Sequence, residues 1–237
     1  AIGYRALYAA NTGGSNTAIG HEAGISITSG AMNVAIGYHA GYNNQTGVYN
    51  VHIGMQAGYG AASNSANTNT FVGYKTGYDV TTGGNNVAIG GSALENLTSG
   101  ADNVAVGNQA GDALTTTSNV VLVGRNAGGV INSTDANGTV AVGYAALAAL
   151  TEGVANIAIG NNAGNEISTG DNNTAIGFEA GSELKDDSNN TFLGSYAGFA
   201  IESSENTFIG AEAGYGVQGT TVGSQNTAIG YRSTLQI

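Results

Sequence analysis

A five-residue pattern that recurs along the whole chain constrains the fold more than any other feature. It reads Asn, a β-branched residue, a variable residue, an aliphatic residue and Gly, as in 16–20, 33–37 and 86–90. Most successive copies are 17 residues apart. Self-similarity at a fixed period is typical of proteins in which stacked copies share one core. The closing glycines of the fourteen copies are Gly3, Gly20, Gly37, Gly54, Gly73, Gly90, Gly107, Gly124, Gly143, Gly160, Gly177, Gly194, Gly210 and Gly230.

Each copy predicts one short β-strand. The residue three before the closing glycine is Thr, Val or Ile, and the residue one before it is Ile, Val or Leu. Side chains alternate along a strand, so these two positions share one face, and the mostly small residue between them lies on the other. We expect the aliphatic face to stack into a continuous core ladder. We expect the alanine-rich face to pack against another chain.

Three positions of each copy form the predicted structural ladder. Asn tolerates the left-handed backbone of a corner and bonds nearby backbone groups, and stacked amides can also bond each other. The closing glycine supplies the positive φ that a turn requires. In four representative copies the ladder residues are Asn16, Ile19, Gly20, Asn33, Ile36, Gly37, Asn86, Ile89, Gly90, Asn173, Ile176 and Gly177.

The same pattern excludes a helical fold. Each glycine costs roughly 1 kcal/mol in a helix, and no 3.6-residue apolar period crosses the glycine-rich joints. A second, weaker strand is expected on the other side of each coil, as over 24–28. The predicted fold is all-β: a parallel β-solenoid of about 14 coils of about 17 residues, in a single array over residues 1–237. Because residues 1–3 already lie inside a repeat, we expect a fragment of a longer fibre protein.

Charge limits the classes of partner. The net charge is −11, from 16 acidic and 5 basic residues. Phosphate recognition needs clustered Lys and Arg, so we expect neither nucleic acid nor a membrane surface as a partner of this segment. No stretch approaches the roughly 18 apolar residues of a membrane helix. The absence of cysteine excludes a disulfide scaffold and cysteine-ligated metal sites.

The motif N-[TV]-A-I-G-x-x-A-G, as in Asn16–Gly24, resembles the head repeats of trimeric autotransporter adhesins. It is also similar to repeats of phage tail-fibre proteins. The resemblance covers the chain from Ala1 to about Tyr231. It implies a left-handed parallel β-roll in which three chains pack side by side, and an extracellular location in a virion tail fibre or on a bacterial cell surface. One departure is that the adhesin repeats are usually shorter than 17 residues.

Tyrosines are the candidate contacts for a receptor or glycan. Tyr38, Tyr74 and Tyr144 directly follow a closing glycine, whereas Tyr59 and Tyr215 follow Ala-Gly. Exposed aromatic rings could stack on sugar rings, or they could pack over glycine gaps between neighbouring coils or chains. Three insertions, at 59–68, 129–138 and 215–225, are the loops most suited to receptor contact.

Catalytic and metal sites are not expected. The three histidines, His21, His39 and His52, occupy different positions in their repeats, so we do not expect them to converge on a metal ion. The acidic residues are scattered over variable positions and are interpreted as solubilising charges. No nucleophile–base motif and no calcium-binding repeat occurs, so we expect neither an enzyme nor a cofactor.

Two functions from different classes remain open. The first is a structural or adhesive fibre segment, a homotrimer that acts as a stiff spacer with receptor or glycan contacts. The second is a stand-alone β-solenoid that binds an extended surface such as polysaccharide or ice. Regular ladders of Thr and Asn motivate the second function. The Thr positions alternate with Val and are expected to belong to the aliphatic core face, which weakens this alternative.

Overall fold

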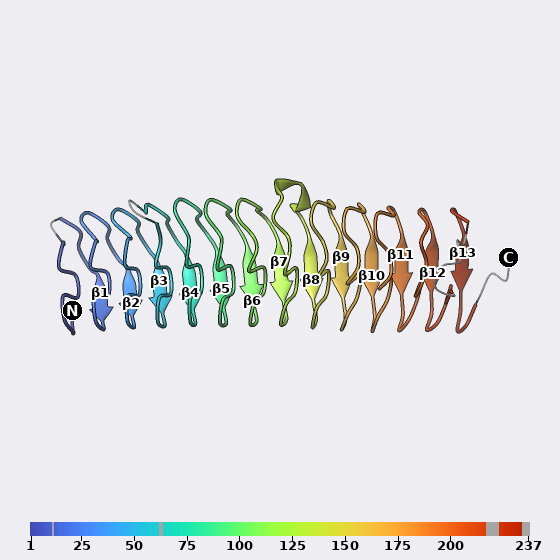
Figure 1. Cartoon of the computed structure of the whole chain (residues 1–237), viewed down its shortest axis with the longest axis horizontal. Coiled ribbons are helices and arrows are strands. Elements are labelled where there is room, and N and C mark those ends of the chain that lie inside the picture. The colour runs from blue at the N-terminus through green and yellow to red at the C-terminus, as the bar shows by residue number, and fades with distance from the viewer. Residues whose placement is uncertain (11, 62–63, 217–222, 234–237) are drawn as a thin grey trace. The chain divides into compact units, whose positions relative to one another are not determined.

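The computed structural model describes residues 1–10, 12–61, 64–216 and 223–233. Within them lie thirteen parallel strands of three residues each, one per repeat, stacked as a β-solenoid of about 12 turns with about 17 residues per turn (Figure 1). The predicted all-β parallel solenoid is confirmed. The fourteenth copy, at Ile2, makes only an isolated parallel bridge to Ile19.

The chain divides into two compact units, Ala1–Asn119 and Val120–Ile237. The first contains β1 (Thr17–Ile19), β2 (Val34–Ile36), β3 (Val51–Ile53), β4 (Thr70–Val72), β5 (Val87–Ile89) and β6 (Val104–Val106). The second contains β7 (Val121–Val123), the 3₁₀ turn η1 (Thr134–Ala136), β8 (Val140–Val142), β9 (Ile157–Ile159), β10 (Thr174–Ile176), β11 (Thr191–Leu193), β12 (Thr207–Ile209) and β13 (Thr227–Ile229).

Strands pair in register with the equivalent residues of the next repeat. In the first unit Ala18 pairs with Ala35 and Ile19 with Ile36. In the second, Ala175 pairs with Phe192. The prediction that equivalent side chains stack in columns is therefore confirmed, and the parallel ladder uses β-branched residues that suit a pleated backbone.

The predicted direction of the two strand faces is wrong. In all thirteen strands the middle residue is buried, whereas both flanking residues are at least partly exposed. Ala18 is 0% exposed, but Ile19 is 39% and Ile89 41% exposed. The strand centre faces the interior of the coil, where alanine is the most common residue and Phe71 and Phe192 are equally buried. The alanine-rich face therefore points inward and the aliphatic face outward.

The aliphatic core comes from a column that the strand pattern does not contain. Its members lie seven residues after a closing glycine, on the opposite side of the coil, and are at most 1% exposed. They are Ile27, Val80, Leu97, Leu114, Ile131, Leu150, Ile167, Leu184 and Ile201. Burying such a side chain contributes about 1.5–3 kcal/mol, so this column supplies much of the stabilisation that was expected from the strands.

The second strand predicted at 24–28 is not formed. This stretch is a series of turns, because Glu22 and Gly24 have φ of 53° and 58°, which an extended strand cannot accommodate. Backbone hydrogen bonds nevertheless join this side to the next coil: the Gly24 N–H donates to the Ala40 carbonyl at 2.9 Å, and the Ser26 N–H to the Tyr42 carbonyl at 3.2 Å.

The asparagine corner is confirmed as a hydrogen-bonded ladder, but the left-handed backbone lies one residue earlier than predicted, as at Met32 with a φ of 58°. The backbone N–H of Asn33 donates to Asn16 Oδ1 at 2.9 Å, and Asn33 Nδ2 donates to the same oxygen at 3.1 Å. Asn33 Nδ2 also donates to the Gly47 carbonyl at 2.8 Å. In the second unit Asn173 has the same arrangement with Asn156. These buried amides are satisfied by their neighbours in the stack, as buried polar groups must be.

The closing glycines are required twice over. Gly20 has a φ of 137°, which L-residues rarely adopt, and a Cβ added there would lie 2.5 Å from the carbonyl oxygen of Gly37 in the next coil. The position four residues later is also glycine in most copies. At Gly77, an added Cβ would overlap the ring of Phe71. Leu94 can occupy the equivalent position because the strand centre of its coil is Ala88.

Candidate functional site

A surface with a continuous aliphatic column beside a column of Val, Ile and Thr runs along the strands of each unit. We call it the outer ladder: the side chains three and one residues before each closing glycine, from β1 to β6 in one unit and from β7 to β13 in the other. No charged residue belongs to it. Exposed apolar area that is contiguous rather than scattered marks interaction surfaces in soluble proteins. The outer ladder is therefore a candidate for contact with another surface.

Aromatic and Met side chains widen this surface in the first unit. Tyr38, Met55 and Tyr74 directly follow closing glycines and are 46–47% exposed. Met32 and Tyr49, which directly precede the corner asparagines, are more than half exposed.

The five predicted tyrosine contacts fall into two columns. Tyr38, Tyr74 and Tyr144 hold the position after the closing glycine and are exposed, Tyr144 with the Arg125 guanidinium 5.9 Å from its ring centroid. Tyr59 and Tyr215 hold the position five residues after it. Whether any of them touches a glycan stays a prediction.

Ring stacking occupies the faces of the second column. Tyr59 lies between Tyr42 and Tyr78, with centroids 4.9 Å away on both sides and planes within 11° of parallel. Burial, and after it the nearby Tyr78 and Tyr42, raises the pKa of Tyr59. Tyr215 stacks on Phe199 at 5.1 Å. These rings pack between neighbouring coils, which leaves mainly their edges for a ligand.

Two histidines and a carboxylate converge in the first unit, contrary to the expectation that the histidines lie apart. One ligand atom each of His21, Glu22 and His39 lies within 4.8 Å of the others. His39 Nε2 is 3.1 Å from Glu22 Oε2, and Arg5 Nη1 is 2.9 Å from Glu22 Oε1. Among the described residues, no other group of three His, Asp or Glu side chains comes together so closely.

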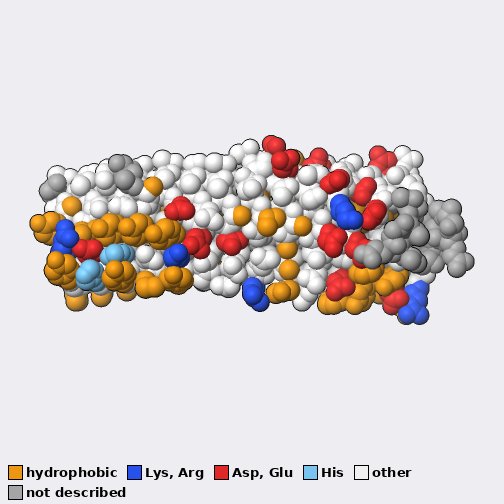
Figure 2. All heavy atoms as spheres, viewed as in Figure 1, with side chains coloured by type: hydrophobic (Ala, Val, Ile, Leu, Met, Phe, Trp, Pro, Cys, Tyr) orange, Lys and Arg blue, Asp and Glu red, His pale blue; other side chains and the backbone are white. Residues whose placement is uncertain are grey.

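Neighbouring rings hold both imidazoles of this cluster. Tyr38 stacks on His39 with 3.8 Å between centroids, and His21 lies between Tyr4 and Tyr38 at 5.1 and 5.3 Å. Figure 2 shows histidine side chains at the surface of the first unit, next to hydrophobic and charged groups. The position one residue after a closing glycine, held by His21, neighbours the position two residues after the closing glycine of the next coil, held by His39. The repeat spacing alone does not predict this contact between different positions.

The third histidine is separate and lies inside the coil. His52 occupies the strand centre of β3, is 2% exposed and stacks on Phe71 at 5.5 Å. Its Nε2 atom has no hydrogen-bond partner among the described residues. Burial disfavours the charged imidazolium and lowers the pKa of His52 to about 4. It is neutral at physiological pH and is a packing residue.

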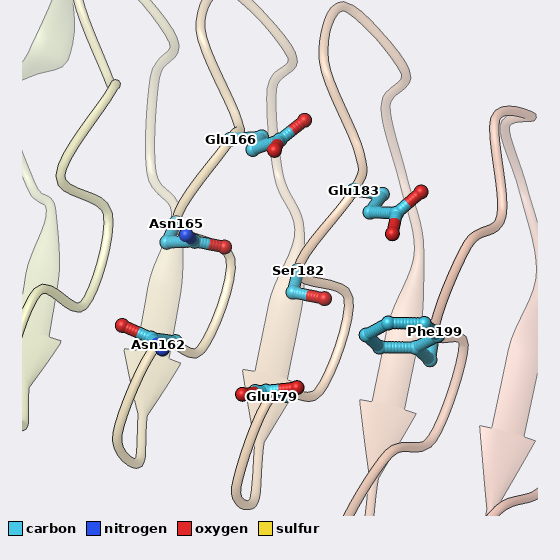
Figure 3. Close-up of a pocket in the computed structure, with 7 residues that line it drawn as sticks. All are labelled: Asn162, Asn165, Glu166, Glu179, Ser182, Glu183 and Phe199. Atoms are coloured by element: carbon cyan, nitrogen blue, oxygen red, sulfur yellow. The ribbon is translucent and has the colours of Figure 1, made fainter. Parts of the chain in front are cut away.

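The second unit carries a polar pocket of about 180 Å³ (Figure 3). It arises because Ser182 occupies the column position that Phe199 holds in the next coil, so a small side chain leaves room where a ring would stack. Figure 3 shows Glu166, Ser182 and Phe199 on three successive coils. The residues that line the pocket are Asn162, Asn165, Glu166, Glu179, Ser182, Glu183 and Phe199.

The structure describes the three insertions to different extents. The insertion at 129–138 contains the 3₁₀ turn η1, whose Asp135 N–H donates to Ser133 Oγ at 3.1 Å. In the insertion at 59–68, the Gly60 N–H donates to the Tyr78 carbonyl and Asn64 forms a parallel bridge with Asn44, whereas residues 62–63 lie outside the described residues. The insertion at 215–225 includes residues 217–222, which lie outside the described residues.

Comparisons with known proteins add no further constraint. No family model matches the chain, and neither the curated proteins nor the solved structures contain a match. Among the described residues, no helix has the length and apolar character of a membrane span. The fold defines a β-solenoid repeat protein, and its function has to be argued from the surfaces described above.

Proposed function

We propose that this chain is a structural or adhesive fibre segment, a stiff spacer whose copies associate side by side through the outer ladder. The observation that carries this proposal is the exposure of the aliphatic strand positions in every described repeat. In a single chain they remain in contact with water. Removing such area from water contributes roughly 25 cal/mol per Å², so a partner that covers the ladder stabilises the fold.

A second copy of the chain fits this surface better than an unrelated partner does. The ladder repeats once per coil, so a parallel copy presents the same side chains at the same spacing along its length. Contacts between Ile or Val of one copy and Ile or Val of another then recur at each coil. Most soluble homo-oligomers close cyclically. Three copies around one axis would cover all three ladders, as the sequence resemblance to trimeric adhesins and tail fibres implies.

This function is consistent with the remaining surface. Acidic residues outnumber basic ones 16 to 5, which favours solubility and disfavours nucleic acid and anionic membrane partners. Receptor or glycan contacts are assigned first to Tyr74 and Tyr144, which are 47% and 48% exposed, because the ring of Tyr38 stacks on His21 and His39. We place the fibre outside the cell, in a virion tail or on a bacterial surface.

Multi-angle light scattering on the purified chain tests the association. We expect a mass of three chains for the wild type. Ile53→Asp combined with Ile89→Asp places charges on the outer ladder and should yield monomers with an unchanged β-sheet circular dichroism spectrum. Thr82→Asp, on an exposed turn, is the matched control and should stay trimeric. A monomeric wild type contradicts the proposal.

A second function gains support from the corrected strand faces. The first residues of β10 to β13 are Thr174, Thr191, Thr207 and Thr227, which pair in register and lie on the outward face. A regular outward threonine row could bind ice or a polysaccharide as a stand-alone solenoid. Thermal hysteresis and a glycan array test this alternative, and a monomer that is active in either assay would favour it over the fibre segment.

A further inference from the structure

We propose that His21, Glu22 and His39 bind one divalent transition-metal ion, of the Zn²⁺, Ni²⁺ or Cu²⁺ class, and so link two neighbouring coils of the first unit. His21 and Glu22 follow the closing glycine of β1, and His39 follows that of β2. This site is independent of the proposed fibre function, because it lies within one chain.

The distance between two of the three ligand atoms, His39 Nε2 and Glu22 Oε2, already suits a metal ion. Zinc binds imidazole nitrogen and carboxylate oxygen at about 2.0–2.2 Å, so two ligand atoms of a tetrahedral site lie about 3.3–3.5 Å apart. His39 Nε2 and Glu22 Oε2 are 3.1 Å apart. All three ligand atoms lie within 4.8 Å. His21 is exposed and packs between the rings of Tyr4 and Tyr38, so its imidazole reaches the ion by a shift of about an ångström within the plane of that stack.

The backbone positions these side chains before any metal binds. Glu22 and His39 occupy the same place in successive coils, two residues after the closing glycine, with φ of 53° and 55°. The His39 N–H donates to the His21 carbonyl at 3.0 Å, which joins the two ligand-bearing turns. Tyr38 stacks on His39 and restricts its ring. Rigid placement of this kind reduces the ordering that binding requires.

The charges around Glu22 leave one oxygen for the ion. Arg5 pairs with Oε1 and thereby orients the carboxylate, so that Oε2 faces His39. Outer partners that orient a ligand in this way are typical of metal sites. His39 Nε2 is buried, and no hydrogen bond satisfies it among the described residues, although Glu22 is close. A bound ion would satisfy both atoms.

The ligand set selects the class of ion. Two imidazoles and one carboxylate suit Zn²⁺, Ni²⁺ and Cu²⁺, whereas Ca²⁺ and Mg²⁺ prefer oxygen ligands alone. Three protein ligands leave at least one position for water. Since imidazole must be neutral to coordinate, affinity should fall in acid.

Isothermal titration of the full-length, tag-free chain with ZnCl₂ and NiCl₂ tests the site. After chelator treatment we expect one ion per chain and a raised melting temperature. His21→Ala, His39→Ala and Glu22→Gln should each weaken binding at least tenfold. Glu179→Gln is the matched control, because Glu179 holds the same position in the second unit with a φ of 51°; it should leave binding unchanged.

A spectroscopic readout separates the site from adventitious binding by surface histidines. Bound Cu²⁺ should show electron paramagnetic resonance couplings to two imidazole nitrogens, reduced to one in His21→Ala. Glu22→Gln preserves side-chain shape, so its circular dichroism should match the wild type and a loss of binding cannot be ascribed to unfolding. Absence of saturable binding at one ion per chain overturns the proposal, and so does wild-type affinity in Glu22→Gln or His21→Ala.

Discussion

The two units fill the same buried column with stacked rings of different polarity. In the first unit His52 lies against Phe71, with centroids 5.5 Å apart and planes 14° from parallel. In the second unit Phe192 lies against Phe208 at 5.3 Å and 7°. The two arrangements are almost the same, although the Nε2 atom of His52 has no hydrogen-bond partner in the part of the chain that the structure describes. The shape of the ring therefore decides how it packs in this column. The polarity of the ring affects stability only when the ring has to become charged.

Among the substitutions that compare the two units, truncating a ring of either pair should change the free energy of unfolding most. Phe192→Ala removes a fully buried ring and should lower the free energy of unfolding by about 3–5 kcal/mol, because the rigid coils cannot close the cavity. Phe71→Ala should lower it by a similar amount in the first unit. Urea denaturation followed by circular dichroism measures both. A loss below about 1 kcal/mol would mean that the coils collapse onto the cavity.

Acid should separate the two pairs. Burial lowers the pKa of His52 to about 4, whereas an unfolded histidine has a pKa of about 6.5, so between these values the unfolded chain binds the extra proton. The contribution of His52 to stability is constant above pH 6.5 and declines by about 3 kcal/mol as the pH falls to 4. His52→Phe should remove this decline.

The measurement for His52 compares urea midpoints of wild type and His52→Phe at pH 7.5 and 4.5. Carboxylates titrate in both proteins, so the difference between the two proteins isolates the histidine. The same acid-induced loss in both would show that the imidazole is hydrated or already paired in the folded chain.

A change at the asparagine corner should have a smaller effect, and a nearly equal one in both units. Asn173 Oδ1 accepts from the backbone and side chain of Asn190, and its Nδ2 donates to Asn156 and to the Asp187 carbonyl. Asn173→Ala should cost about 1–3 kcal/mol, because buried partners lose their hydrogen bonds. Asn33→Ala is the counterpart in the first unit. Differential scanning calorimetry would detect unequal shifts, which would mean that the corners are not equivalent.

The smallest effect is expected at the exposed ion pairs. Lys185 Nζ is 2.9 Å from Glu202 Oε1 in the second unit, and Lys75 Nζ is 3.3 Å from Glu95 Oε1 in the first. Solvent screens such pairs, so Lys185→Ala and Lys75→Ala should leave the melting temperature unchanged within error. A clear drop in only one variant would reveal a local role for that lysine.

The sequence predicts the strand, the corner asparagine and the closing glycine, because each depends on local backbone chemistry that recurs in every copy. It does not show which strand face is inside, since alternation defines two faces but not what lies behind them. The signal that could have settled this is the column of Leu97, Leu114 and Leu150, seven residues after their closing glycines. That column already supplies an aliphatic interior, which leaves the strand aliphatics outside.

The histidine cluster was missed for a related reason. His21 lies one residue after its closing glycine and His39 lies two residues after its own. The repeat alignment therefore places the two histidines in different columns and does not predict a contact between them. In three dimensions, however, each side chain also neighbours the adjacent position of the next coil. Contacts of this diagonal kind depend on the offset between turns, which the one-dimensional spacing does not contain.

The close stacking of the closing glycines also restricts how such a gene can change in length. An added Cβ at Gly37 would lie 2.5 Å from the Gly54 carbonyl oxygen, and Gly177 stands in the same relation to Gly194. Recombination that adds or deletes a whole coil keeps each closing glycine stacked on the closing glycine of the next coil. Recombination that shifts the repeat register places a residue with a side chain in this glycine column. Viable descendants should therefore differ by entire coils or by insertions within the turns, such as the one at 129–138.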